Sequence, residues 1–365
     1  MTKIEQVQQW IGENNADLAI ISDPETIDYL TGFYSDPIER VLMLIIFKHQ
    51  DPFIFAPALE VEAIKDTGWT NPVYGYLDHE NPWNMIHDRI QEREVDVKEI
   101  AIEKGNLNVA RFEEYRRILP ASNFSLDLTP MIQKMKLIKS DDEIEKLKIA
   151  GQWADFAFEK GFEAVKVGRS EQEVVAELQY ALMQKGIMQM SFETLVQAGA
   201  HAAEPHGATS TNKIENNELV LFDLGTVWDG YISDASRTIA VGTPTDKQMD
   251  IYKVCLEAQL AAQDYAKPGI TAEELDKVAR DIIEKAGYGE YFIHRLGHGM
   301  GMSEHEFPSI MEGNQMILQP GMCFSIEPGI YIPGVAGVRI EDCVHITENG
   351  NEPFTHTSKE LQYFG

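Results

Sequence analysis

Short apolar runs alternate with polar, turn-forming stretches along the N-terminal part of the chain. Leu18–Ser22, Val41–Lys48 and Glu99–Glu103 have the length of buried strands, and Phe53–Phe55 is placed to pair with the second of them across a turn. Asp23–Thr26 carries a proline one place inside the start of a predicted helix. This alternation predicts an α/β domain with a mixed sheet. Because it contains no glycine-rich phosphate loop, we expect this domain to be a scaffold or to carry a lid.

The pattern changes near Pro130, where we place the boundary between an N-terminal domain, residues 1–130, and a C-terminal domain, residues 131–365. Beyond the boundary, Ser140 and Glu143 have the spacing of a capping box, in which each side chain binds a backbone N–H at the start of a helix. The stretch that follows has apolar residues at helical spacing and predicts a long amphipathic helix.

The C-terminal domain contains an internal repeat. Lys166–Glu173 is similar to Lys267–Glu274, since each is a turn with a capping box at the start of a helix, and a glycine ends each helix. A histidine-bearing segment follows in both copies, and then a strand that ends in an acid, a spacer and a glycine, as in Phe222–Gly225 and Ile326–Gly329. Each strand then returns to a second acid. Features that recur in the same order predict a duplicated α+β domain whose halves meet at a pseudo-twofold axis.

Composition and charge limit the classes of function. The 365 residues carry a net charge of −28, from 31 basic and 59 acidic side chains, which disfavours binding to nucleic acid. No apolar run approaches the ~20 residues that span a bilayer, and the N-terminus lacks the apolar segment of an export signal. Cys255, Cys323 and Cys343 are too widely spaced for a disulfide framework. We therefore expect a cytoplasmic protein that binds neither nucleic acid nor membrane.

Four acids and a histidine occur in apolar, glycine-flanked strands, where an unpaired charge is costly. Asp223 and Asp234 stand on either side of a Trp-Asp-Gly turn, so a hairpin would bring them close together. Glu327 and Glu341 bracket a second turn, and residues that face each other in a hairpin lie ~4.5–5.5 Å apart at Cβ. Carboxylates so close repel each other unless a cation lies between them. Together with His298, they suit two divalent cations of the manganese, cobalt or zinc type.

The motifs around these residues resemble those of the metal-dependent pita-bread peptidases, and most closely those of the short bacterial Xaa-Pro dipeptidases, or prolidases. The similarity covers nearly the whole chain, the N-terminal α/β domain included. The matching motifs are Phe222–Gly225 with Gly230–Thr238, His294–Gly301 with His305–Pro308, Ser325–Gly329, and Gly337–Asp342. The resemblance implies a pita-bread (creatinase/aminopeptidase-like) fold for residues 131–365 and, as the activity, the hydrolysis of Xaa-Pro dipeptides.

The resemblance also implies a role for each predicted metal ligand. Asp223 would be a terminal ligand of one metal ion. Asp234 and Glu341 would bridge both ions, and His298 and Glu327 would complete the second. Two divalent ions per subunit are expected, manganese first, with cobalt or zinc as alternatives.

Further roles follow from the same resemblance. Glu327, close to the attacking water, would carry a proton to the leaving proline nitrogen. His305 would stabilise the negative charge that develops on the carbonyl oxygen, and His206 would lie on the substrate side. Arg339, two residues before Glu341, is predicted to serve the substrate site or to hold the carboxylate of a metal ligand.

The limit on substrate length stays open from the sequence. Ser309 stands where some relatives have an arginine that holds the substrate carboxylate, so that contact must come from His206, Arg295 or the N-terminal domain. An enzyme of the aminopeptidase P type, which trims longer Xaa-Pro peptides, is therefore the alternative. Methionine aminopeptidases usually lack the N-terminal domain, and a metal-free relative such as creatinase would have lost ligands that this chain keeps. The resemblance further implies a homodimer.

Overall fold

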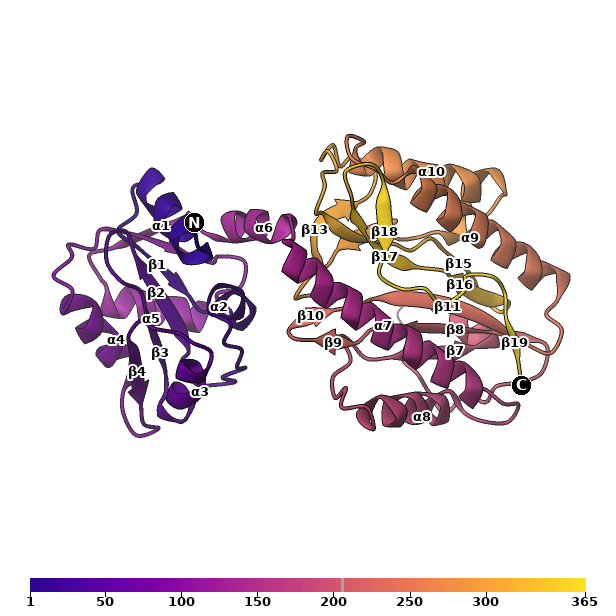
Figure 1. Cartoon of the computed structure of the whole chain (residues 1–365), viewed down its shortest axis with the longest axis horizontal. Coiled ribbons are helices and arrows are strands. Elements are labelled where there is room, and N and C mark those ends of the chain that lie inside the picture. The colour runs from indigo at the N-terminus through magenta and orange to yellow at the C-terminus, as the bar shows by residue number, and fades with distance from the viewer. Residues whose placement is uncertain (205–206) are drawn as a thin grey trace. The chain divides into compact units, whose positions relative to one another are not determined.

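The computed structural model describes residues 1–204 and 207–365, and the chain divides into two compact units, Met1–Gln133 and Lys134–Gly365 (Figure 1). Helix α6 (Thr129–Leu137) contains the division. No helix of the described residues has both the length and the apolar character that crossing a membrane requires.

The first unit is built on a mixed six-stranded sheet in the order β4-β3-β2-β1-β5-β6. Strand β2 is antiparallel to β1 and β3, whereas the pairs β1–β5, β5–β6 and β3–β4 are parallel, which confirms the predicted α/β arrangement. The strands are β1 (Leu18–Ile21), β2 (Met43–Phe47), β3 (Phe53–Pro57), β4 (Val73–Tyr76), β5 (Glu99–Ile102) and β6 (Asn123–Asp127). The helices are α1 (Lys3–Glu13), α2 (Pro24–Thr31), α3 (Val61–Asp66), α4 (Pro82–Gln91) and α5 (Val109–Ile118).

The central strands of this sheet are buried along their whole length, which is typical of strands covered on both faces. Strands β1 to β3 therefore read as continuous apolar runs. The Asp23 side chain accepts a hydrogen bond from the backbone N–H of Thr26 at 2.9 Å, and Pro24 occupies the first turn of α2, as the sequence predicts.

The second unit contains two helix pairs and the strands between them. Its helices are α7 (Asp141–Ala164), α8 (Glu171–Met183), α9 (Asp246–Tyr265) and α10 (Ala272–Lys285). Its strands are β7 (Leu195–Ala198), β8 (Glu218–Leu224), β9 (Val227–Trp228), β10 (Tyr231–Ile232), β11 (Ala235–Val241), β12 (Gly297–Gly299), β13 (Glu306–Ile310), β14 (Cys323–Ile326), β15 (Gly329–Ile332), β16 (Ala336–Arg339), β17 (Asp342–Ile346), β18 (Asn351–Pro353) and β19 (Tyr363–Phe364). Helices α8 and α10 lie at opposite borders of the unit, with the strands between them (Figure 1).

The internal repeat is present in the backbone. Helices α8 and α10 both begin with the predicted capping box. The turn before each helix makes the same contact with a later segment: Gly168 N–H donates to the carbonyl of Ile214 at 2.8 Å, and Gly269 N–H to that of Leu318 at 2.9 Å. Each half has its own apolar core, one beneath α7 and α8 and the other beneath α9 and α10.

The strands of the second unit form two larger sheets among the described residues. One has the order β19-β11-β8-β7 and the other β13-β12-β14-β17-β18, and the hairpin β15-β16 continues from β14 and β17. The backbone N–H of Glu341 donates to the carbonyl of Ser236 at 3.0 Å and links the two halves where β11 and β17 begin. The predicted acids lie at this meeting place.

Candidate metal centre

The five predicted ligands all line one cavity of 310 Å³ in the second unit. Asp223 lies within β8, and Asp234 comes directly before β11. His298 is the central residue of β12, Glu327 follows β14 directly, and Glu341 comes directly before β17. Both halves of the repeat therefore contribute ligands to the same cavity.

Asp223 and Asp234 approach each other diagonally. Asp223 pairs with Ser236 in the β8–β11 ladder, so Asp234 is offset from it by two residues. The offset keeps both acids on one face of the sheet, because side chains of a strand alternate between faces. A Cβ on Gly225 would lie 1.8 Å from the carbonyl oxygen of Ser233, so only glycine lets the chain between the acids approach so closely.

Glu327 and Glu341 face each other. Ile326 pairs with Asp342 on one side of them, and Gly329 pairs with Arg339 on the other. The same register holds on both sides, so the two glutamates stand opposite each other at the junction of the two ladders. This is the arrangement that the hairpin pattern of the sequence predicts.

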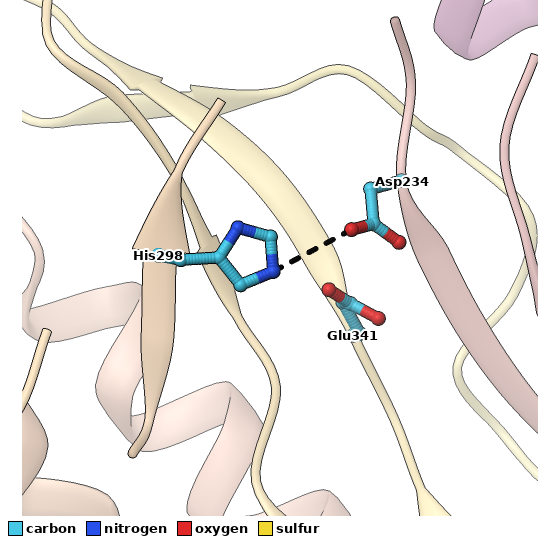
Figure 2. A group of neighbouring side chains, drawn as sticks. All are labelled: Asp234, His298 and Glu341. Atoms are coloured by element: carbon cyan, nitrogen blue, oxygen red, sulfur yellow. Dashed lines mark ion pairs between the residues drawn. The ribbon is translucent and has the colours of Figure 1, made fainter. Parts of the chain in front are cut away.

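His298 directs Nε2 toward the carboxylates. This nitrogen lies 3.2 Å from Oε1 of Glu327 and 3.6 Å from Oδ2 of Asp234. Figure 2 shows the imidazole pointing at Asp234 and Glu341 from a separate strand. The other ring nitrogen, Nδ1, lies 3.2 Å from the carbonyl oxygen of Gly299, to which it donates a hydrogen bond. Such a bond fixes the tautomer and leaves Nε2 with a lone pair for a cation.

The electrostatics of the cluster favour a bound cation. Burial, and after it the charge of Asp223, raises the pKa of Asp234 well above its ordinary value. Burial, followed by the charge of Asp234, does the same to the pKa of Glu341. Burial alone would lower the pKa of His298, but its hydrogen bond to Glu327 and the charge of that residue raise it to about 9. These shifts show carboxylates that cannot all carry their charge unless a cation is added.

Two acceptor atoms of the cluster have no hydrogen-bond partner among the described residues. Oδ1 of Asp223 and Oε1 of Glu341 are buried and accept no hydrogen bond from the described residues. Donor atoms of Asp234, His298 and Glu341 lie within 4.8 Å of one another, which is the spacing of a metal site. Carboxylate and imidazole donors suit divalent manganese, cobalt or zinc. The residues present therefore fit a divalent metal.

Arg339 is joined to the carboxylate cluster by hydrogen bonds. Its guanidinium, which is nearly fully buried, donates through Nη2 to Asp223, through Nε to Ser236 Oγ at 2.8 Å and through Nη1 to the Tyr331 hydroxyl at 2.8 Å. Ser236 in turn donates to Oε2 of Glu341 at 2.7 Å. These contacts favour the holding of carboxylates over the binding of substrate as the role of Arg339.

Sequence reasoning did not single out Tyr331, Ser236 or Ser325. Ser325 Oγ donates to Oε1 of Glu327 at 3.0 Å and accepts from the backbone N–H of His298 at 2.9 Å. The sequence offered one signal for Tyr331, the glycine two residues before it. A Cβ on Gly329 would lie 2.3 Å from its hydroxyl, and the glycine in that position leaves room for the phenol ring.

Two further histidines and a second arginine also line the cavity. His305, His294 and Arg295 line it together with the ligands. Arg295 Nη1 donates to Ser309 Oγ at 3.1 Å, so this arginine lies beside the position where some relatives carry theirs. His206, predicted to contact substrate, lies outside the described residues.

Comparison with known proteins agrees with this geometry. Residues 145–348 match metallopeptidase family M24, and residues 3–138 match the creatinase/prolidase N-terminal domain. The chain belongs to metallopeptidase family M24. As a member of M24 with a fitting donor group, it is a metal-dependent hydrolase.

Relatives of this M24 peptidase match it along nearly its whole length. A curated Xaa-Pro dipeptidase of Lactobacillus helveticus is 55% identical over 360 residues, which cover 98% of each chain. The crystal structure of a recombinant prolidase from Thermococcus sibiricus is 34% identical, with a TM-score of 0.93 and coverage of 99% of this chain and 98% of that one. The structure of an Xaa-Pro dipeptidase from Bacillus anthracis is 33% identical, with a TM-score of 0.92 and 99% coverage of both chains. They confirm the predicted pita-bread fold.

Proposed function

We propose that this M24 peptidase hydrolyses Xaa-Pro dipeptides and releases the C-terminal proline. The convergence of Asp223, Asp234, His298, Glu327 and Glu341 on one cavity carries the proposal. The curated relative that is 55% identical over 98% of both chains is named an Xaa-Pro dipeptidase, which supports the same substrate class.

We assign two divalent ions, manganese in the first instance, to these five side chains. Asp223 would bind one ion, Asp234 and Glu341 would bridge, and His298 and Glu327 would bind the other. When bound, such a pair polarises the scissile carbonyl and lowers the pKa of a water toward neutrality. The donor count supports this assignment, because four carboxylates exceed what one divalent ion neutralises.

The protein side chains would move protons and hold charge. Glu327 takes the proton of the attacking water and gives it to the proline nitrogen as the C–N bond breaks. A secondary amine leaves only when it is protonated, so this transfer completes the cleavage. His305 donates a hydrogen bond to the carbonyl oxygen of the Xaa residue as negative charge develops there.

Arg295 is our choice for the group that binds the substrate carboxylate. It lines the cavity and is held by Ser309 at 3.1 Å, and a guanidinium can bind a carboxylate through two parallel hydrogen bonds. Binding the carboxylate of proline would favour dipeptides over longer chains. His206 is proposed as a second contact on this side.

We also propose that the enzyme acts as a homodimer in the cytoplasm. The three cysteines are free and buried, which suits a reducing compartment. Sedimentation of the purified protein gives the mass of the assembly.

Hydrolysis of Ala-Pro and Ala-Pro-Ala by the metal-loaded protein tests the function. The proposal predicts that Ala-Pro is cleaved and that kcat/KM for the tripeptide is lower by ~10²-fold or more, because its proline carboxylate is replaced by an amide. Ala-Ala serves as the control for the proline requirement. Preferred cleavage of the tripeptide would instead assign the enzyme to the aminopeptidase P type.

A further inference from the structure

The turn that contains His305 is held by hydrogen bonds to the carboxylate of Glu306. Oε1 of Glu306 accepts hydrogen bonds from the backbone N–H groups of Met302, at 3.0 Å, and Ser303, at 3.4 Å. A Cβ on Gly301 would lie 2.7 Å from both oxygens of this carboxylate. The chain therefore passes closely around Glu306, and the position of the carboxylate sets the shape of the turn.

The second oxygen of Glu306 binds a lysine from a distant part of the sequence. Nζ of Lys139 donates to Oε2 at 2.8 Å, although the two residues are 167 positions apart. Only 3% of the lysine side chain and 7% of the glutamate side chain are exposed. Lys139 is fixed in turn, since its backbone N–H donates to the carbonyl of Gly321 at 2.9 Å, just before α7 begins.

Burying an ion pair is energetically less favourable than burying two apolar side chains. Removing both charges from water costs free energy that a pair of apolar side chains of the same volume would avoid. An apolar side chain at position 306 could not, however, accept hydrogen bonds from Met302 and Ser303. The charge of Lys139 offsets the free-energy cost of burying the Glu306 carboxylate, and the carboxylate holds the turn through its hydrogen bonds.

This turn also positions a side chain of the cavity. His305 directly precedes Glu306 and lines the cavity, with its ring centroid 4.3 Å from that of His298. The carbonyl of Gly301, at the other end of the turn, accepts a hydrogen bond from the backbone N–H of Ile232 at 2.9 Å, close to Asp234. A shift of Glu306 would therefore move His305 relative to the metal ligands.

We propose that Lys139 and Glu306 are positioning residues that hold His305 in place for catalysis. The inference rests on the role proposed above for His305. Neither residue touches the substrate, and both act through the turn of residues 301–306.

The first experiment compares Lys139→Met in two backgrounds. In the otherwise native, metal-loaded enzyme, the variant should lower kcat for Ala-Pro by ~10²-fold, as a misplacement of about 1 Å does, with KM and bound metal unchanged. In the His305→Ala background the same substitution should cause no further loss, because the residue it positions is already absent. Lys139→Arg should restore most of the rate.

A second readout does not depend on activity. Amide hydrogen exchange of residues 302–306, measured in the metal-free protein, should speed up in Lys139→Met. Lys139→Met/Glu306→Leu leaves no buried charge and no acceptor for Met302 and Ser303. It should therefore fold even if the single variant does not, and it should show the same faster exchange. Lys160→Met is the control, because Lys160 pairs with Glu159 and Glu163 within α7, at 2.7 and 2.8 Å, and not with Glu306.

An equal loss of kcat in both backgrounds would show a general structural effect and overturn the proposal. Unchanged exchange of residues 302–306 in both variants would also overturn it. If the native enzyme fails to cleave Ala-Pro, the proposed function is wrong, and the exchange measurement alone then decides whether Lys139 and Glu306 hold the turn.

Discussion

The imidazole rings of His298 and His305 lie with their centroids 4.3 Å apart and their planes at 68°. Among the described residues, the donor group that fits a metal contains His298 with Asp234 and Glu341 but not His305. His305→Ala should therefore keep the metal and lower kcat by ~10²–10³-fold, the cost of removing one donor to a developing oxyanion. Steady-state kinetics and metal analysis of the same sample check this. Loss of metal would show that His305 is itself a ligand.

Asp234→Asn tests the bridging assignment. Removing one negative charge from the centre of the cluster should lower the metal content by at least one ion per chain and abolish most activity. The fold should survive, since Asp234 lies before β11 and not within the ladder. Asp229 is an exposed acid on the neighbouring turn. Asp229→Asn is therefore the control and should keep both its metal content and its activity. Full metal occupancy with normal turnover in Asp234→Asn would refute the assignment.

Arg339→Lys tests the support of Asp223. Lysine keeps the charge but has a single nitrogen, so it cannot contact Asp223, Ser236 and Tyr331 together. Metal affinity should fall by ~10–100-fold, as for other losses of a partner behind a ligand. Tyr331→Phe removes one of the three contacts and should have a smaller effect. Calorimetric titration of each metal-stripped protein measures the metal affinity. Equal affinity in the native protein, Arg339→Lys and Tyr331→Phe would contradict the role of Arg339 in holding Asp223.

Glu103 predicts a pH dependence of stability in the first unit. Burial raises the pKa of this carboxyl to about 7, although it accepts hydrogen bonds from the backbone N–H groups of Ser22 and Asp23 at 3.2 Å. Between its ordinary pKa and about 7, the folded state holds a proton that the unfolded state has released. Stability should therefore fall as pH rises through this range, by up to ~1.4 kcal/mol per pH unit.

Glu103→Gln should flatten that slope and stabilise the protein above pH 7 relative to the native chain. Urea unfolding of both proteins at several pH values gives the difference. Glu62→Gln, an exposed acid on α3, is the control and should leave the slope unchanged. A parallel pH dependence in the native protein and Glu103→Gln would contradict the prediction.

Local chemistry made much of the fold predictable. Asp23 caps α2 and Ser140 begins α7 because each side chain binds a backbone group three residues away. The repeat was visible because both halves use the same capped turn. Glu327 and Glu341 were paired correctly since one turn and one register relate them.

Contacts between distant segments could not be predicted in the same way. Lys139 and Glu306 are 167 positions apart, and Arg339 and Asp223 are 116 apart, so no periodicity links them. The diagonal placement of Asp223 and Asp234 depends on how the chain crosses at Gly225, which tertiary packing decides. The assignment of all five side chains as ligands stays a prediction, and it rests on isolated acids in apolar strands, which need a partner of opposite charge.

Titration of the metal-stripped protein with manganese tests whether the five side chains hold a cation pair for dipeptide hydrolysis. Bound metal per chain and the rate of Ala-Pro hydrolysis are measured on the same samples. We predict that stripped protein is folded but inactive, and that the rate rises with bound metal until two ions per chain are present. An undiminished rate in the stripped protein would contradict the claim.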